Sequence, residues 1–232
     1  MFLVVLAYSV VQFSGYIIFR NRLCGGGIVV LCAMARPAPD HDFIMPIYRR
    51  SRTVSDSQGA FSTVPRGYHQ PHVDAHDERN LSFSVYRELY EELFGGEEVE
   101  RGTRHYHPDW FFPRCEPLQW LLNHPESYTL ECTGFGMNLR LGDYTFVILL
   151  AVHDEDFYRL YGRRITGNWE ASESVDDRRR ISSKKPEILS SLIGNAAQWD
   201  GAALFAFVEG LRRLEKLDKE IGAGRVNLPQ IE

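Results

Sequence analysis

The sequence is poor in cysteine, has no excess of positive charge and contains no apolar run long enough for a membrane span. Its four cysteines form no CxxC pair, which argues against a zinc knuckle or a disulfide framework and favours reduced thiols. Lys and Arg number 26 against 31 Asp and Glu, so the net charge of -5 gives no general grip on a nucleic-acid backbone. We therefore expect a cytoplasmic protein that binds neither nucleic acid nor a membrane.

The N-terminal stretch MFLVVLAYSVVQF lacks the features of a signal peptide. No Lys or Arg precedes its apolar residues, and no small-residue cleavage site follows them. The stretch is also shorter than the about 20 residues that cross a bilayer. Together with YIIFRNR it is rich in β-branched residues, and the intervening Ser14 and Gly15 predict that residues 1–22 form two strands of a hairpin.

The 232 residues are 44% hydrophobic, enough for a sizeable core, and show no repeat or linker, so we expect a single domain over residues 1–232. A second hairpin is predicted where IVVLCAMAR and FIMPIYRR flank the turn PAPDHD. Residues 51–77 and the charged segment SVDDRRRISSKKP are expected to be loops. Further along, the sequence predicts two strands in YTLECTGFGMNLRLGDYTFVILLAVH and helices in EPLQWLLNH, DEDFYRLYG, PEILSSLI and residues 200–221.

A predicted helix over residues 80–95 carries the chemistry-bearing pattern. Asn80 is its expected N-cap, and its apolar residues gather on one side. Glu88, Glu91 and Glu92 gather on the opposite side, where like charges destabilise a helix by about 0.2 to 0.5 kcal/mol per pair. Mg2+ offsets such repulsion, because it takes carboxylate, water and phosphate oxygens as ligands. The pattern therefore predicts a site for a hard divalent cation such as Mg2+, with a plain solvated helix face as the alternative.

The segment Arg87-Glu88-Leu89-Tyr90-Glu91-Glu92 resembles the second half of the signature box of the Nudix hydrolases, G-x5-E-x7-R-E-U-x-E-E-x-G-U, where U is aliphatic. The turn Val64-Pro65-Arg66-Gly67, the hairpin before it and the strands and helix after the box also resemble that family. The first half departs from the box, since Val73 stands at the position of its first glycine and Arg79 at that of its first glutamate. Gly67 serves as that glycine only if the loop carries an insertion.

The resemblance implies an α+β protein, a Nudix-type α/β/α sandwich with a mixed sheet. It also implies hydrolysis of a diphosphate linkage in a small nucleoside-diphosphate-type metabolite, with Mg2+ or Mn2+ as cofactor. By position in the box, Glu88, Glu91 and Glu92 are expected to bind the metal, and Glu88 and Glu92 to take part in catalysis. Arg87 is expected to orient these glutamates by ion pairing, and Gly67 to support the site.

Other side chains are candidates for supporting roles. A later carboxylate often completes the site in the Nudix family, and Glu170 or Glu173 is the candidate here. Arg49, Arg52 and Arg66 flank the loop before the helix and are expected to bind phosphate oxygens, although a plain surface cluster explains them equally well. Weaker candidates, for a transition-metal site and for stacking on a base, are His69, His72, His76, Tyr68, Trp110, Phe111 and Phe112.

A second function agrees with the same residues. Loss of the first glycine and glutamate of the box is what a binding-only descendant would show. The alternative is therefore a catalytically inactive Nudix-like sensor or regulatory module that binds its ligand without cleaving it. In either case the expected partner is a small-molecule diphosphate. An edge of the apolar N-terminal strands would also allow a homodimer.

Overall fold

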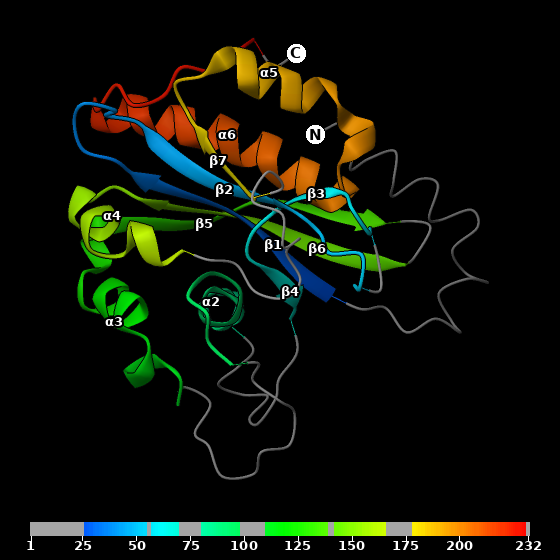
Figure 1. The fold of residues 1–232 in the computed structure, drawn as a ribbon, viewed down its shortest axis with the longest axis horizontal. Coiled ribbons are helices and arrows are strands. Elements are labelled where there is room, and N and C mark those ends of the chain that lie inside the picture. The colour runs from blue at the N-terminus through cyan, green and yellow to red at the C-terminus, as the bar shows by residue number, and fades with distance from the viewer. Residues whose placement is uncertain are drawn as a thin grey trace.

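A mixed sheet forms the middle layer of the protein (Figure 1). The structure, a computed structural model, describes residues 26–54, 57–69, 80–97, 110–138, 142–165 and 178–230, and in this part of the chain the sheet has seven strands. The hairpin expected within residues 1–22 lies outside the described residues. The strands are β1 (Gly26–Ala35), β2 (Phe43–Arg49), β3 (Phe61–Thr63), β4 (Arg66–Tyr68), β5 (Tyr128–Asn138), β6 (Asp143–Val152) and β7 (Arg178–Ser182).

Strand β1 lies inside the sheet and is buried on both faces. It runs parallel to β6, starting with Gly26 beside Tyr144, and its C-terminal end pairs antiparallel with β2. Alternate residues of β1 belong to the two cores, so Val30 on one face and Leu31 on the other are both fully buried. A strand covered on both faces needs a continuous apolar sequence, which IVVLCAMA supplies. The predicted β1–β2 hairpin is confirmed.

The segment containing β3 and β4 lies between β1 and β2. Strand β3 pairs with β2, and β4 pairs with β1 over Gly27 to Val29. The Val30 amide donates to the Pro65 carbonyl at 2.9 Å and fixes the link between the two short strands. The expectation of an irregular loop over residues 51–77 is therefore wrong for this part. Strands of three residues are too short to show a period in the sequence, and their neighbours impose the extended conformation.

Strand β7 lies on the other edge of β2, with Ser182 beside Ile44 and Arg178 beside Tyr48. The expectation of a solvated loop over residues 174–186 is therefore wrong for the residues of β7. The run of charges hides this strand in the sequence, but Ile181 is buried in the core and anchors it. A single apolar residue among charges gives no periodicity to detect, so only pairing with β2 defines the strand.

The predicted pair of strands after residue 127 is confirmed as β5 and β6. They pair antiparallel, and the register shifts once, between Cys132 and Gly134. Gly142 lies in the turn between them with a φ of 82°, a left-handed conformation that favours glycine. Strand β5 is the edge of the described sheet on this side.

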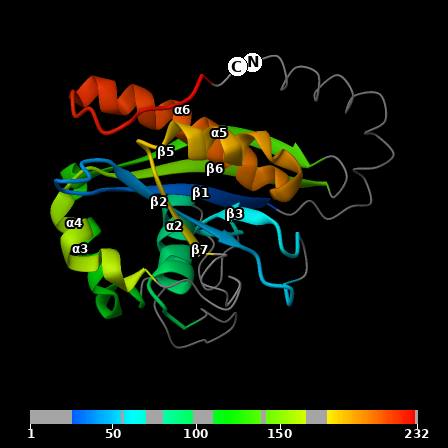
Figure 2. The ribbon, with the colours of Figure 1, turned by 45° about the horizontal axis from the view of Figure 1, so that its top comes forward.

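Helices cover both faces of the sheet (Figures 1 and 2). The helices on one face are α2 (Leu81–Glu88), α3 (Glu116–Asn123) and α4 (Glu155–Tyr161), and those on the other are α5 (Pro186–Gly194) and α6 (Gly201–Ile221). The predicted helices are present, and the predicted α+β sandwich with a mixed sheet is confirmed. Among the helices of the described ranges, none combines the length and the apolar character of a membrane span.

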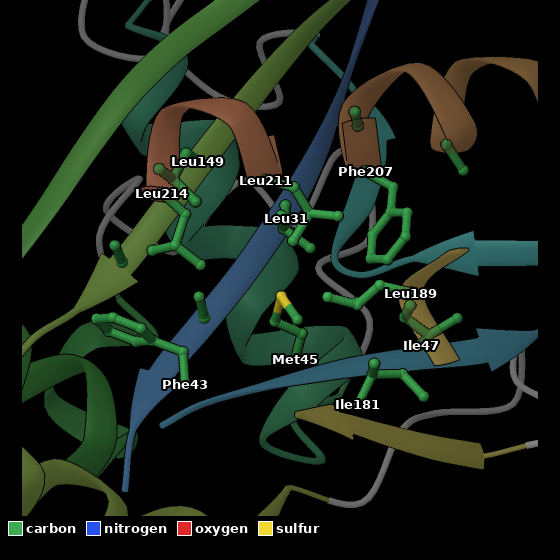
Figure 3. Close-up of a cluster of buried hydrophobic side chains, with 14 of the residues drawn as sticks. Leu31, Phe43, Met45, Ile47, Leu149, Ile181, Leu189, Phe207, Leu211 and Leu214 are labelled. Atoms are coloured by element: carbon green, nitrogen blue, oxygen red, sulfur yellow. The ribbon is translucent and has the colours of Figure 1, made fainter. Parts of the chain in front are cut away.

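Helix α6 packs on the sheet through an apolar stripe (Figure 3). Phe207, Leu211 and Leu214 are fully buried in the same cluster as Leu31 of β1. Gly210 allows this close approach, because a Cβ atom there would lie 2.6 Å from Leu31 Cδ2. The helix has Asp200 as its N-cap and ends at the left-handed Gly222, which confirms the helix predicted over residues 200–221.

Candidate functional site

Helix α2 lies along strand β4, and polar residues join the two elements. A π-helical turn, Leu89–Leu93, extends α2 along the helix that the sequence predicts over residues 80–95. Residues later in the helix contact residues earlier in the strand, so the two elements run antiparallel. We call these residues the α2–β4 row: Ser84 with His69, Arg87 with Tyr68, Glu88 with Gly67, and Glu92 with Arg66.

Glu88 lies directly against the backbone of Gly67. A Cβ atom built on Gly67 would come within 2.0 Å of Glu88 Oε1, so no larger residue fits unless the carboxylate moves. The alternation of β4 explains the contact: Gly67 pairs with Ile28 of β1 and shares its face, which is the face that α2 covers. The space that the Glu88 carboxylate occupies is therefore the reason for a glycine at position 67.

Arg87 is enclosed within the row, with only 3% of its surface exposed. Its Nη2 donates to Glu88 Oε1 at 2.6 Å and to the Tyr68 carbonyl at 2.8 Å, and its Nε lies 4.0 Å from Glu91 Oε1. A guanidinium is planar and always charged, so it holds Glu88 in one direction and attracts Glu91. These contacts agree with the orienting role expected for Arg87.

Glu92 is also buried, and its Oε2 accepts a hydrogen bond from the Arg66 backbone amide at 3.0 Å. Glu88 and Glu92 expose 7% and 4% of their surface, and Glu91 is half-buried. The alternative of a solvated helix face is therefore wrong for Glu88 and Glu92. A buried carboxylate is costly unless donors or charges compensate it, and β4 supplies such donors on the side of α2 that carries the glutamates.

The π-helical turn changes the spacing of the glutamates. The Phe94 amide donates to the Leu89 carbonyl, five residues earlier, at 3.1 Å. Such turns are rare in proteins, but those that occur are often found at functional sites. The wider turn rotates the residues that follow it around the helix axis. Glu91 and Glu92 lie within this turn, so their direction relative to Glu88 departs from that of a regular α-helix. The sequence analysis assumed 3.6 residues per turn and therefore did not predict this change in the direction of the two glutamates.

The described part of the row offers two buried carboxylates to a divalent ion. Glu88 and Glu92 reach adjacent residues of β4, and proteins usually hold Mg2+ with one or two carboxylates together with water and phosphate oxygens. Hard oxygen donors beside a glycine fit such an ion. Among the described residues, no group of three or more His, Cys, Asp or Glu side chains is arranged to hold a metal ion. Glu170 and Glu173 lie outside the described residues.

Two of the arginines expected to bind phosphate lie in or beside turns away from the row's contacts. The Arg49 guanidinium donates to the Gly59 carbonyl at 2.8 Å and to Gln198 Oε1 at 2.9 Å, and its Cζ lies 4.0 Å from the Phe61 ring centroid. These contacts tie the end of β2 to the start of the α6 region. Arg52 lies in an exposed turn. The structure therefore does not bring Arg49 to the carboxylates.

Arg66 contributes its backbone to the row, while its side chain lies elsewhere. It precedes Gly67 in β4, so its side chain points to the opposite face, where Nη1 lies 3.2 Å from Asp200 Oδ1. Burial by itself raises the pKa of Asp200, but the Arg66 charge and hydrogen bonds from Ser57 and the Ala203 amide bring it below its ordinary value. The Arg66 guanidinium thus stabilises a carboxylate at the start of α6.

Three aromatic side chains near the row were not among the candidate site residues predicted from the sequence. Phe135, Tyr144 and Phe146 form a cluster on strands β5 and β6, with ring centroids between 5.2 and 6.0 Å apart. Tyr144 covers Gly26 so closely that a Cβ atom there would lie 2.0 Å from its ring, and Phe135 exposes 46% of its surface. Tyr144 and Phe146 alternate along β6, and this period of two was the available signal.

The weaker candidates from the sequence fall in different places. The aromatic run at residues 110–112 packs against the core, where Phe111 is fully buried. His69 hydrogen-bonds through Nδ1 to Ser84 Oγ at 2.7 Å, while His72 and His76 lie outside the described residues. Ser84 gave no signal in the sequence, because a serine inside a helix is ordinarily a neutral surface choice.

Comparison with known proteins gives likenesses of fold. No protein-family model and no curated protein sequence matches the chain. A mutT/nudix family protein from Listeria innocua aligns with a TM-score of 0.48 at 10% identity, over 86% of this chain and 99% of that one. A Nudix hydrolase from Alicyclobacillus acidocaldarius gives 0.46 at 11% identity, over 90% and 99%. The Nudix domain of Shewanella oneidensis NrtR, complexed with ADP-ribose, gives 0.45 at 10% identity, over 87% and 98%. Each of these alignments has a TM-score below 0.5 and assigns no chemistry to this chain.

Proposed function

We propose that the chain hydrolyses the diphosphate linkage of a small nucleoside-diphosphate-type molecule at the α2–β4 row, with Mg2+ or Mn2+ as cofactor. One observation carries this proposal: Glu88 and Glu92 are buried carboxylates that reach adjacent residues of one strand. A helix–strand contact made only for stability would be apolar, because the cost of desolvating a buried carboxylate can exceed the free energy that its ion pair contributes. Charged groups retained in such a place favour a chemical role.

The row divides this work among its residues. Glu88 and Glu92 would hold the ion together with water and phosphate oxygens. The positive charge of the ion would neutralise phosphate oxygens and make a bound water more acidic. Arg87 keeps the Glu88 carboxylate in one orientation through its hydrogen bond of 2.6 Å. Hydrolysis breaks one P–O bond and adds water across it, so a carboxylate must accept a proton from the attacking water. Glu88 and Glu92 are the candidates for this base.

The aromatic cluster supports a ligand that carries a base. Tyr144 covers Gly26, and Gly26 precedes Ile28, the partner of Gly67, by two residues of β1. Strand spacing and rise place Gly26 and Gly67 about 8 Å apart. One small molecule can therefore meet the carboxylates and the rings together, and a flat base would stack on the half-exposed Phe135.

Hydrolysis is tested with purified protein, Mg2+ or Mn2+, and a panel of nucleoside-diphosphate-linked compounds that includes ADP-ribose. The expected result is release of a nucleoside monophosphate or phosphate that requires the metal. Glu92→Gln should abolish this release while the protein stays folded, since an amide can still accept the hydrogen bond from the Arg66 amide. Glu209→Gln, at a half-exposed glutamate of α6 paired with Arg212, is the matched control and should leave the rate unchanged. Absence of turnover across the panel would overturn the proposal.

Binding without hydrolysis is the second candidate, and a specific observation favours it. Glu88 already accepts from Arg87, and Glu92 already accepts from the Arg66 amide. The described residues contain no three-ligand metal group. Calorimetric titration with ADP-ribose, with and without Mg2+, separates the two candidates. Tight binding that is indifferent to metal and yields no product would support the sensor, whereas metal-dependent binding with turnover would support the hydrolase.

A further inference from the structure

A β-bulge in strand β5 decides which side chains of that strand face helix α2. The register of the β5–β6 pair shifts between Cys132 and Gly134, so Thr133 is the extra residue. Before the bulge, Leu130 packs against the core that α2 covers. In an unbroken strand the even-numbered residues would continue on this face, and Phe135 would point toward α6 instead. The bulge reverses the alternation and brings Phe135 to the α2 face.

The residues after the bulge confirm this change of face. A Cβ atom built on Gly134 would lie 3.0 Å from the Phe205 ring, and one built on Gly136 would lie 3.4 Å from it, so both glycines face α6. Phe135 lies between them and faces the other way. Its ring centroid lies 5.2 Å from that of Phe146, which packs against the core that α2 covers. Bulges that redirect a side chain in this way are frequent beside active sites.

The ring of Phe135 is supported by its neighbours and is exposed at the same time. It exposes 46% of its surface, although it contacts the rings of Tyr144 and Phe146. Strand β5 is an edge of the described sheet, and edge strands ordinarily carry charged residues that prevent association with other chains. An aromatic cluster exposed at such an edge is typical of a surface that binds a partner or a ligand.

Phe135 lies in line with the contact between Glu88 and Gly67. Phe135 pairs with Phe146 of β6, which in turn lies beside Ile28 of β1. Ile28 pairs with Gly67 of β4, so these four residues of the sheet share one face. Three strand spacings place Phe135 about 14 Å from Gly67. An extended nucleoside diphosphate can bridge this length, with its phosphates at the α2–β4 row and its base at the Phe135 ring.

We infer that Phe135 is the specificity-determining residue of the site: its ring stacks on the base of the ligand and selects ligands by the area of that base. This inference rests on the proposed function and deepens it, because it states which nucleoside diphosphates the row takes. Stacking recognises the π face that every base has and does not read its hydrogen-bonding edge. A purine has a larger face than a pyrimidine, so purine ligands bind more tightly, and a diphosphate without a base binds most weakly.

The test compares non-cleavable diphosphates in the presence of Mg2+ by calorimetry: α,β-methylene-ADP, α,β-methylene-CDP and methylenediphosphonate. Wild type should bind the adenine compound at least about tenfold more tightly than methylenediphosphonate, the usual effect of one stacked base, with the cytosine compound between them. Phe135→Ala should lose most of this difference and should bind methylenediphosphonate within about twofold of wild type. Phe135→Trp should keep the order of the three compounds, because it retains an aromatic face.

Leu160→Ala is the matched control. Leu160 lies on α4 and also exposes a large apolar side chain, with 58% of its surface accessible, so its truncation should leave all three affinities unchanged. Gel filtration of wild type and Phe135→Ala shows whether the ring instead holds a second copy of the chain. A Phe135→Ala protein that keeps the preference of wild type for the adenine compound overturns the inference. So does a change from dimer to monomer with unchanged affinities.

A second measurement does not depend on the variants folding. Carbon-13 NMR of the phenylalanine rings in wild type should show that α,β-methylene-ADP moves the resonances of Phe135 and leaves those of the buried Phe157 in place. Wild type that binds the adenine compound with unmoved Phe135 resonances, or that binds all three compounds equally, overturns this inference alone. Wild type that binds none of the three and cleaves no compound of the panel overturns the proposed function and this inference together.

Discussion

Gly67 and Glu88 approach each other so closely that a single added Cβ atom would lie 2.0 Å from the Glu88 carboxylate oxygen. These residues are far apart in the chain, and they meet because α2 lies along β4. The contact places a charged group on bare backbone inside the protein, where Arg87 compensates its charge. The geometry of the site therefore requires a residue without a side chain at position 67, as well as the side chains of Glu88 and Arg87.

Gly67→Ala should disturb both the fold and the site. Overpacking of a well-packed position typically costs about 1 to 3 kcal/mol, and here the Glu88 carboxylate must move away from β4. We expect the free energy of unfolding in urea to fall by this amount, and turnover or ligand binding at the row to be lost.

Gly194→Ala is the control for this prediction. Gly194 ends α5, and a Cβ atom there meets no atom within 4 Å. Its stability should be unchanged or raised by up to about 1 kcal/mol, because alanine favours the helix. Equal effects of the two substitutions would show that the Gly67–Glu88 contact has no special importance.

Arg87→Ala should be strongly destabilising. It removes the guanidinium that compensates Glu88 in a buried place, and breaking a buried ion pair in this way typically costs about 3 to 5 kcal/mol. Urea denaturation followed by circular dichroism measures the loss. Arg212→Ala, at an exposed arginine paired with Glu209, should change stability by less than about 1 kcal/mol. A small effect at Arg87 would contradict the inference that the row holds a compensated buried charge.

Asp42 should make stability depend on pH in the acid range. Arg36 donates to both of its carboxylate oxygens at 2.8 Å, and the Ser182 hydroxyl also donates to it. Burial raises the pKa of Asp42, but these hydrogen bonds bring it below its ordinary value. A carboxyl with a lower pKa in the folded state stabilises the fold above its ordinary pKa, and this stabilisation is lost as pH falls through the folded pKa.

The free energy of unfolding of wild type and Asp42→Asn therefore should differ most near neutral pH. The difference should shrink as the pH falls below about 4, the ordinary range of an aspartate. Asp156→Asn, at an exposed aspartate paired with Arg159, is the control and should show a small difference at every pH. A difference for Asp42→Asn that stays constant from pH 7 to about 3 would exclude a lowered pKa.

Several parts of the fold could be predicted because their signals are local. The apolar stripe of α6, its cap at Asp200 and its end at Gly222 are all within reach of a few residues of sequence. Strands β1, β2, β5 and β6 are long enough to show apolar runs or alternation. Strands β3, β4 and β7 were missed, because short segments take their conformation from the strands that pair with them.

The amino-acid pattern is enough to place Glu88, Glu91 and Glu92 on one helix directly after Arg87, and to show that an apolar side of this helix must be buried. Three features depend on the packing of the folded chain: Glu88 and Glu92 are also buried, the Arg66 guanidinium pairs with Asp200, and His69 hydrogen-bonds to Ser84. The reason is physical. Periodicity reports which side of an element is apolar, whereas the partner of its polar side depends on contacts between residues far apart in the chain.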